Sequence, residues 1–190
     1  TAWEDVALIR EIPGAVICDP ADDVQMEWII KEFLKMEGIH YVRSNRKAVR
    51  NVYKKGSSFK IGQGNILKEG KDILIIAAGQ LVSEALDCAE ELEKEGYSVE
   101  VIDMFTIKPL DEKLLIKEAK GKSKIVTIEN HSIYGGLGSA VSEVIAENGI
   151  SVPVKRIGVK EKFGQVGTAE FLQEEFGLTA KQIKETICQF

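Results

Sequence analysis

Two arginines and a serine, Arg43, Ser44 and Arg46, stand where a short apolar segment, residues 39–43, ends. The segment is expected to be a strand, so the guanidinium groups and the hydroxyl lie at a strand terminus. Arginine grips a phosphate or a carboxylate through two parallel hydrogen bonds. A structural ion pair with a carboxylate of another segment explains the same residues equally well. The residues alone therefore leave phosphate binding and an ion pair both open.

A glycine-rich turn with Gly135, Gly136 and Gly138 separates an expected strand, residues 125–128, from an expected amphipathic helix. Free amides at the start of such a helix can hold a phosphate. Counted from Gly136, however, the motif is G-x-G-x-x-V, and Val141 replaces the third glycine of the dinucleotide fingerprint. No acidic residue follows at the end of the next strand. The pattern favours a tight turn that packs the helix against the sheet, and a simple nucleotide-binding module is disfavoured.

His131 follows the same expected strand, in the polar turn Glu129–Asn130–His131. The ends of parallel strands are where α/β proteins place ligands, and Glu129 could orient the imidazole. No nucleophile or metal ligand accompanies His131, so a hydrogen-bonded turn histidine at a subunit or domain contact is favoured. The three cysteines also lack metal-ligand spacing. We expect no catalytic residue, no cofactor-binding residue and no metal ligand in this chain.

Apolar runs alternate with amphipathic helices along the chain. Residues 1–50 predict the order α-β-α-β, which has too few strands to stand alone. Residues 51–71, rich in Lys, Gly and Ser, are expected to be a linker with a short hairpin near residues 59–67. Residues 72–190 contain four apolar runs between helices, which predicts a mostly parallel sheet with helices on both faces.

The composition describes an ordinary globular α/β protein. The 190 residues carry a net charge of −5, which argues against nucleic acid or an anionic membrane as partner. The longest apolar run, residues 73–78, has the length of a buried strand and is too short to cross a bilayer. An odd number of cysteines without a signal peptide favours the cytoplasm. The chain starts without Met, inside a helical pattern, which suggests a piece of something longer.

Seven motifs together resemble a known family. They are EDVALIREIPG, CDPAD, HYVRSNR, DMFTIKPLD, IENHSIYGGLGSAV, RIGVKEKFG and FGLTAKQI. In order and spacing they resemble the C-terminal subunit of bacterial and archaeal split transketolases over essentially all 190 residues. Deoxyxylulose-phosphate synthase and the beta subunits of 2-oxo acid dehydrogenases are related families, but the FGQVG stretch looks more like transketolase.

The resemblance implies a fold and an activity. Residues 1–50 would be the C-terminal part of a pyrimidine-binding α/β domain, and residues 72–190 a three-layer α/β/α transketolase C-terminal domain. The family transfers a two-carbon ketol unit from a ketose phosphate to an aldose phosphate, with thiamine diphosphate and Mg²⁺. Alignment on Glu4 and Asp5 places the family's catalytic histidine just outside this chain. The chain alone is therefore expected to be inactive and to bind neither cofactor nor metal.

The resemblance also implies a site and partners. Arg46 matches the transketolase arginine that grips the substrate phosphate, with Ser44 and Arg43 as weaker neighbours. The expected partners are an N-terminal transketolase subunit or upstream segment, a second copy in a homodimer, and phosphorylated sugars of the pentose phosphate pathway. A non-catalytic dimerisation or regulatory module with the same fold is the alternative from another class.

Overall fold

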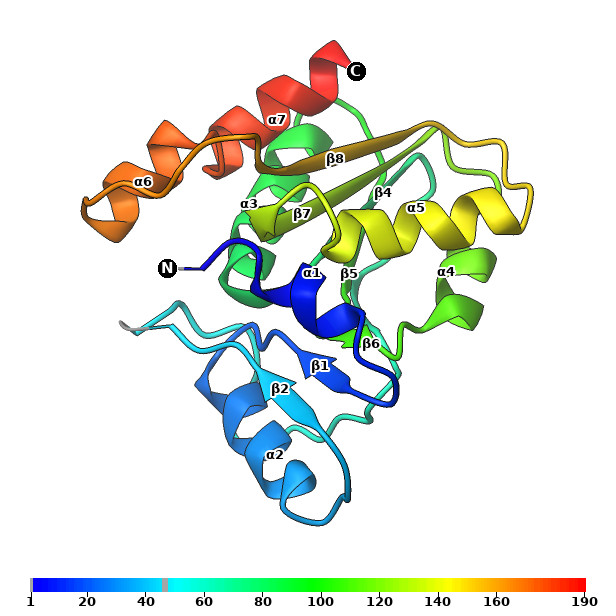
Figure 1. Ribbon diagram of the computed structural model, residues 1–190. Helices are drawn as coiled ribbons and strands as arrows, with labels where there is room; N and C mark the ends of the chain where they lie inside the picture. Colours follow the sequence, from blue (N-terminus) through cyan, green and yellow to red (C-terminus); the bar gives the residue numbers. More distant parts are fainter. Residues whose placement is uncertain (1, 46–47) are drawn as a thin grey trace.

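The computed structural model describes residues 2–45 and 48–190, which form two β-sheets and the helices around them (Figure 1). The helices are α1 (Asp5–Arg10), α2 (Asp23–Phe33), α3 (Val82–Glu93), α4 (Glu112–Ala119), α5 (Leu137–Glu147), α6 (Ala169–Glu175) and α7 (Ala180–Gln189), with a 3-10 turn η1 at Gly79–Leu81. The strands are β1 (Val16–Cys18), β2 (His40–Val42), β3 (Asn65–Lys68), β4 (Ile73–Ala77), β5 (Val99–Asp103), β6 (Thr106–Lys108), β7 (Lys124–Ser132) and β8 (Val154–Val159).

The larger sheet has five strands in the order β3-β5-β4-β7-β8. Strands β5, β4, β7 and β8 are parallel to one another, and β3 runs antiparallel to β5. Every residue of β4 is buried, as expected for a central strand covered on both faces. The prediction of a mostly parallel sheet is confirmed.

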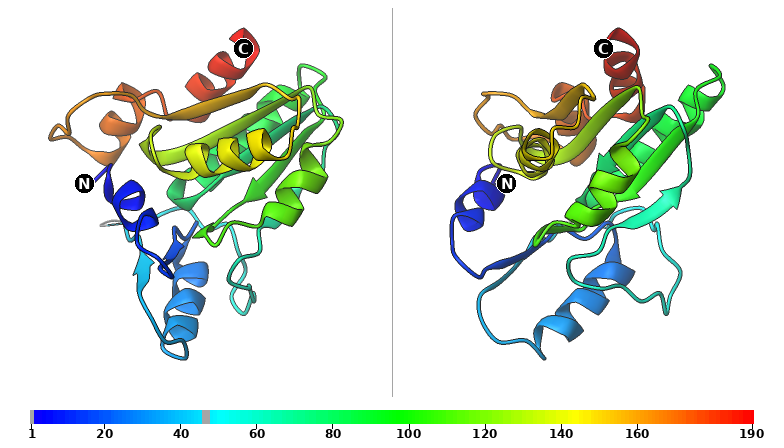
Figure 2. Two further views of the ribbon diagram at one scale, coloured as in Figure 1. Left: turned by 45° about the vertical axis from the view of Figure 1, so that its right-hand side comes forward. Right: turned by 90° about the vertical axis from the view of Figure 1, so that its right-hand side faces the viewer.

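Helices cover both faces of this sheet (Figure 2). On one face, side chains of β4 and β5 pack with α3 and α7, through residues such as Val82 and Ile183. On the other face, the alternate side chains of β4 pack with α4 and α5, through residues such as Leu115 and Val141. Because successive strand residues point to opposite faces, β4 alone contributes to both cores. The expected three-layer α/β/α arrangement is confirmed.

The smaller sheet joins two N-terminal strands to a strand from the middle of the sequence. β1 pairs in parallel with β2 and antiparallel with β6, which comes from residues 106–108. β6 is not among the strands expected from the sequence. Residues 1–50 also share a core with the larger sheet, since Val6 and Ile17 pack with Leu74 and Ile76. A smaller cluster packs Cys18 and Ile29 of these N-terminal elements with Phe105, so residues from later in the chain also complete it.

The segment 51–71, expected to be a linker, contributes a strand to the larger sheet. β3 lies along β5 with Asn65 opposite Asp103, so residues 59–67 do not form the expected hairpin. Gly70 comes so close to β5 that a Cβ there would lie 2.1 Å from the carbonyl carbon of Val99. An antiparallel edge partner so far along the chain leaves no local signal in the sequence. The boundaries 1–50, 51–71 and 72–190 remain predictions.

Aspartates cap two of the helices. The Asp22 carboxylate accepts from Gln25 N at 2.9 Å and begins α2, and Asp111 begins α4 in the same way. α2 ends at Phe33. Ile29 of this helix is fully buried, whereas Ile30 is 43% exposed.

None of the helices formed by residues 2–45 and 48–190 has the length and apolar character needed to cross a membrane.

Candidate functional site

The candidate site lies where β1, β2, β4 and β7 end. Arg43 directly follows β2, and its backbone N donates to Cys18 O at 3.0 Å, at the end of β1. Asp19 follows β1, and its carbonyl accepts from Gly79 N, which follows the end of β4, at 3.0 Å. Carboxyl ends of parallel strands are the usual location of ligand sites in α/β proteins.

The Arg43 guanidinium is bonded by the protein itself. Nε donates to Asp5 Oδ2 and one terminal nitrogen donates to Asp19 Oδ2, both at 2.9 Å. The other terminal nitrogen donates to the carbonyl oxygens of Asn130 at 3.0 Å and Ala2 at 3.3 Å. The side chain is only 12% exposed. For Arg43, the geometry favours the ion-pair alternative over direct contact with a phosphate.

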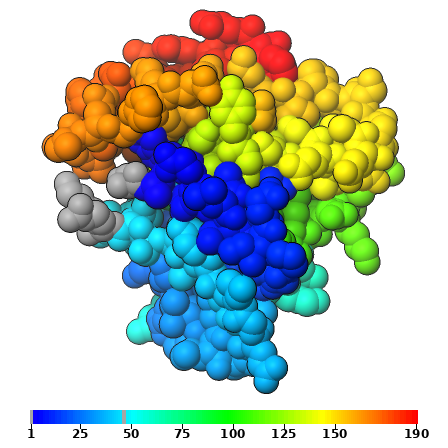
Figure 3. Space-filling view, viewed as in Figure 1, coloured from blue at the N-terminus to red at the C-terminus, as the bar shows by residue number. Residues whose placement is uncertain are grey.

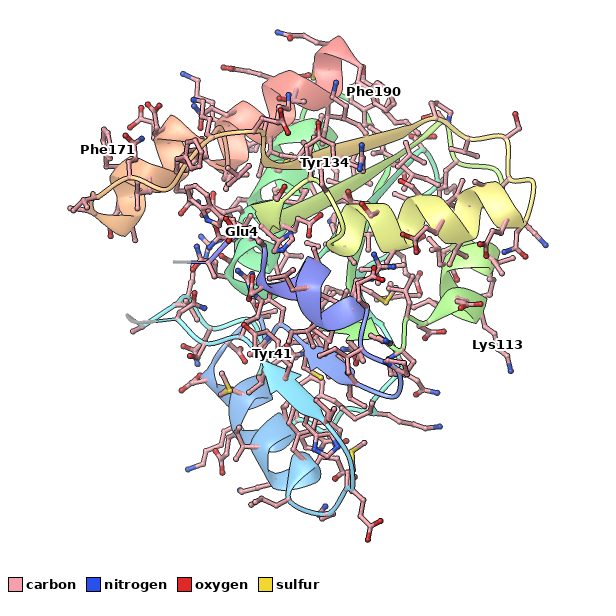
Figure 4. All side chains as sticks on the ribbon, viewed as in Figure 1. Glu4, Tyr41, Lys113, Tyr134, Phe171 and Phe190 are labelled. Atoms are coloured by element: carbon pink, nitrogen blue, oxygen red, sulfur yellow. The ribbon has the colours of Figure 1, made fainter. Side chains whose placement is uncertain are left out.

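Opposite charges close to one another keep the side chains of Arg43 and Asp5 ionised. Burial acts to lower the pKa of Arg43, but the neighbouring carboxylates of Asp19 and Asp5 outweigh it and raise that pKa. Burial acts to raise the pKa of Asp5, but Arg43 and the Tyr41 hydroxyl, which donates at 2.7 Å, lower it on balance. Tyr41 is labelled in Figure 4, at the β2 side of the α1 helix. One cation thus serves two carboxylates.

A glycine makes room for one of these carboxylates. Gly79 has φ of +66°, and a Cβ there would lie 2.5 Å from Asp19 Oδ1. A side chain at this position would displace the Asp19 carboxylate and strain the backbone. The turn after β4 is therefore shaped around the ion pair.

A cavity of about 700 Å³ opens beside the cluster. Its lining includes Ser44, Asn45, Trp3, Leu172 and Phe176. Trp3 and Phe176 pack edge to face with ring centroids 4.6 Å apart. Figure 3 shows the orange segment that contains α6 above the cyan segment that follows β2, at the left of the molecule. The cavity lining thus combines polar and apolar side chains.

The predicted phosphate-binding residues divide into three cases. Ser44 is exposed and lines the cavity. Arg43 borders the same cavity, but its guanidinium is held by Asp5 and Asp19. Arg46 lies outside the described residues. The assignment of phosphate binding to Arg46 and Ser44 stays a prediction.

The glycine-rich turn is closed by a carboxylate of the protein. β7 continues through Glu129, where a turn was expected, and Glu129 accepts from Leu137 N at 2.7 Å and Gly138 N at 2.8 Å. A Cβ on Gly136 would lie 2.0 Å from Glu129 Oε2. Burial raises the pKa of Glu129 to about 7 although the two amides act to lower it. The amides that could hold a phosphate are occupied, which supports the packing role expected for this turn.

His131 is buried between two segments. Its Nδ1 lies 2.7 Å from Ser132 O, and its Nε2 lies 3.7 Å from Asp5 Oδ1. Burial lowers the pKa of His131. The contact joins β7 to α1 within the chain, and His131 lies in strand β7 where a turn was expected. Its place at a subunit or domain contact stays a prediction. Sequence analysis did not predict that Asp5 and Asp19 would share Arg43, since only the fold brings them together.

The described residues do not fit a metal-bound diphosphate. Residues 2–45 and 48–190 contain no group of three or more His, Cys, Asp and Glu side chains placed to hold a metal ion. The amides at the start of α5 are taken by Glu129. A diphosphate at this turn would have to displace a buried carboxylate, so we derive no step through such a group in this part of the chain.

The parallel sheet, its helices on both faces and a polar cluster at the strand ends define an α/β protein with a ligand-type cavity at the usual edge. Residues 62–183 match the family model for the transketolase C-terminal domain. The chain belongs to the transketolase family.

Similar proteins point to split transketolases. The chain is 41% identical, over 96% of its length, to a 6-deoxy-6-sulfo-D-fructose transketolase subunit of Clostridium sp. (strain MSTE9). It is 35% identical, over 94% of its length, to the 1-deoxy-D-xylulose-5-phosphate synthase of Heliobacterium modesticaldum. Among solved structures, a split-gene transketolase, described as an inactive "beta4 tetramer", is similar over the whole of this chain, with a TM-score of 0.93 and 40% sequence identity.

The chain spans only part of these proteins. It covers 56% of the Clostridium subunit, 28% of the Heliobacterium synthase and 61% of the split-gene transketolase chain.

Proposed function

We propose that this chain is the C-terminal part of a transketolase that moves a two-carbon ketol unit from a ketose phosphate to an aldose phosphate. The observation that carries the proposal is the cavity at the strand ends, whose lining includes Ser44 and Asn45, directly before Arg46 in the sequence. An arginine with a hydroxyl nearby suits the phosphate of a sugar. The family match supports the same activity.

The cofactor assignment rests on the family and on the closed turn at α5. Thiamine diphosphate and Mg²⁺ belong to the complete enzyme in this proposal, and their diphosphate site belongs to an N-terminal subunit or upstream segment. The chain alone is then inactive. The proposal also includes pairing with that partner subunit or segment. It further includes a homodimer through the C-terminal and pyrimidine-binding parts, and a cytoplasmic location.

Two kinds of anionic group on the substrate, a phosphate and a sulfonate, are compared with the site. The Clostridium relative is named for a sugar with a sulfo group in place of a hydroxyl. Phosphate and sulfonate are both tetrahedral oxyanions, and Ser44 with Arg46 suits their shared geometry. We favour phosphate, because a sugar phosphate dianion attracts an arginine more strongly than a sulfonate monoanion does.

The substitution Arg46→Ala tests the site in the reassembled enzyme. Losing a charge-assisted hydrogen-bond pair costs about 1.5–3 kcal/mol, so KM for phosphorylated substrates should rise on the order of 10- to 150-fold. Cofactor affinity should not change. Arg50→Ala is the matched control, because Arg50 pairs with Asp87 at the surface and is 53% exposed. Unchanged kinetics in Arg46→Ala would remove Arg46 from the site, and a sulfonated donor preferred over a phosphorylated one would change the substrate class.

Calorimetry with thiamine diphosphate and Mg²⁺ tests the cofactor assignment. We expect binding to the assembly of this chain, its upstream region and the partner subunit, and none to these 190 residues alone. Tight binding by the chain alone would contradict the proposal.

Three alternatives have definite tests. The Heliobacterium relative raises 1-deoxy-D-xylulose-5-phosphate synthase as a second candidate, and a 2-oxo acid dehydrogenase beta subunit is a third. Donor specificity separates both from a transketolase. A non-catalytic dimerisation or regulatory module would assemble with the partner subunit without supporting ketol transfer.

A further inference from the structure

We propose that the open edge of β8 and the lysine-bearing loop that follows it bind a small tetrahedral oxyanion, either free phosphate or the phosphate group of a small metabolite. The inference does not rest on the proposed function. Among the described residues, the hollow at this edge shares only Phe176 with the cavity beside Arg43.

The hollow lies between β8 and the segment that joins α6 to α7. Its volume is about 190 Å³, and its lining includes Ile157, Gly158, Phe176, Gly177 and Thr186. Pockets for complete drug-sized ligands usually enclose about 300–1,000 Å³. The hollow therefore suits one compact charged group better than a whole nucleotide.

The charge of the hollow is opposite to that of the chain. The chain carries a net charge of −5, whereas the ionisable side chains that line the hollow are four cations and one carboxylate. They are Lys155, Arg156, Lys160, Lys162 and Glu175. Positive charge concentrated in a hollow attracts an anion more strongly than the same charge spread over a surface.

Two of these cations lack a carboxylate partner. Lys162 donates to Glu175 at 3.3 Å, so this lysine is neutralised within the chain. In the part of the chain that the structure describes, neither Lys155 nor Lys160 forms an ion pair. The Lys155 Nζ lies 5.5 Å from the centroid of the Phe190 ring, which holds the ammonium without cancelling its charge.

The edge of β8 adds backbone donors. β8 is the last strand of the larger sheet, so one of its edges has no partner strand. Ile125 N donates to Pro153 O at 2.9 Å, and bonding to β7 then involves every second residue of β8. The N–H groups of Arg156 and Gly158 therefore face the open edge, and both residues line the hollow. Unpaired amides at a sheet edge form concave sites for anions.

The Arg156 side chain has a different role. Its guanidinium donates to Ile133 O at 2.7 Å and lies 5.8 Å from the centroid of the Tyr134 ring. We therefore assign the backbone of Arg156, and not its guanidinium, to the oxyanion.

A strained residue places the two lysines of the loop. Glu161 stands between Lys160 and Lys162 and has φ of +33°. It is the one non-glycine residue with a positive φ in the ranges 2–45 and 48–190. Such a conformation is costly for a residue with a side chain, and it occurs often where a protein clamps a ligand. Both neighbouring lysines line the hollow as a result.

Nuclear magnetic resonance of the ¹⁵N-labelled 190-residue chain tests the proposal. Inorganic phosphate is added in place of chloride at constant ionic strength, so that general screening does not change. We expect the amide signals of Arg156 and Gly158 to shift and to saturate with one dissociation constant. Shifts at Ser44 and Asn45 would report on the cavity beside Arg43 and are fitted separately.

Substitutions that remove charge without shortening the side chain much give the second readout. Lys160→Gln should weaken phosphate binding at the β8 edge about 1.5- to 5-fold, the range for an exposed charge pair. Lys155→Gln/Lys160→Gln should weaken it about 2- to 25-fold if the two effects add. Lys113→Gln is the matched control, because Lys113 is an exposed lysine on α4 and lies away from β8 (Figure 4).

The source of the oxyanion follows from a comparison with glycerol 3-phosphate. Tighter binding of this ester than of inorganic phosphate supports the site and identifies its ligand as a phosphorylated metabolite. Equal or weaker binding of the ester at the same amides supports the site and identifies free phosphate.

Two results would overturn the proposal. One is the absence of a saturable shift at the amides of Arg156 and Gly158. The other is equal weakening by Lys113→Gln and Lys160→Gln, which would show that phosphate responds only to the overall charge of the chain.

Discussion

The turn before α5 allows a quantitative test, because a single methyl group added at Gly136 meets a buried carboxylate. The new Cβ would lie 2.0 Å from Glu129 Oε2 and 2.6 Å from His131 Nδ1. The backbone at Gly136, with φ of −88°, adds no left-handed strain, so the whole effect comes from this clash. The carboxylate must leave its position, which breaks its bonds to Leu137 N and Gly138 N.

The expected loss follows from those two bonds. Hydrogen bonds to a charged group contribute about 1.5–3 kcal/mol each, and the movement leaves buried amide donors unpaired. Gly136→Ala should therefore destabilise the chain by about 3–5 kcal/mol. Urea unfolding followed by circular dichroism measures the change. Gly164→Ala is the control, because a Cβ there has only a Trp3 ring atom at 3.9 Å. It should cost less than about 0.5 kcal/mol.

A double-variant cycle decides the mechanism. In the Glu129→Ala background the new methyl group displaces no carboxylate and still meets His131 Nδ1, so Gly136→Ala should cost less than in the parent chain. Full additivity of the two changes, or a Gly136→Ala variant as stable as the parent, would refute the reasoning.

Three further predictions concern pH, helix ends and thiols. Burial raises the pKa of Asp103 to about 7, so its contribution to stability is complete below 3.8 and is lost as the pH rises through 7. The free energy of unfolding of the parent chain should fall between pH 5 and 8, and Asp103→Asn should make this fall smaller by about 2–4 kcal/mol. An equal fall in the variant and the parent chain would contradict this. Thr179→Ala removes the capping box of α7, which packs on α3, and should cost about 1 kcal/mol of global stability. Thr168→Ala, at α6 with no buried residue, should cost less; equal losses would count against the argument. Cys188 is exposed, whereas Cys18 and Cys88 are buried with pKa values raised to about 12, so a thiol reagent should modify one cysteine in the native chain and three after denaturation.

The sequence predicted the parts of the fold that depend on local pattern. The parallel strands and the helices on both faces follow from the periodicity of apolar residues. The strands β3 and β6 were missed, because their antiparallel partners are far along the chain.

The candidate site was likewise predicted only in part from the sequence. The Arg43 side chain was correctly singled out, but no local pattern could decide between a phosphate and a carboxylate as its partner. The choice depends on Asp5 and Asp19, which only the tertiary structure brings to it. Glu129 was placed in a turn, although an acid several residues ahead of a glycine-rich helix start could have suggested a cap. Its role depends on the close approach that Gly136 permits.

The third strand of the smaller sheet has a consequence for synthesis of the protein. β1 and β2 emerge from the ribosome before β6, so the second edge of β1 at Cys18 stays unpaired until Thr106 is made. At about 5–20 residues per second, the unfinished pair spends on the order of ten seconds exposing an unpaired edge. Such an edge can pair with a neighbouring nascent chain. If the gene were divided anywhere between β2 and β6, the edge of β1 would stay unpaired until the two products associated, because neither product could complete the sheet without the other.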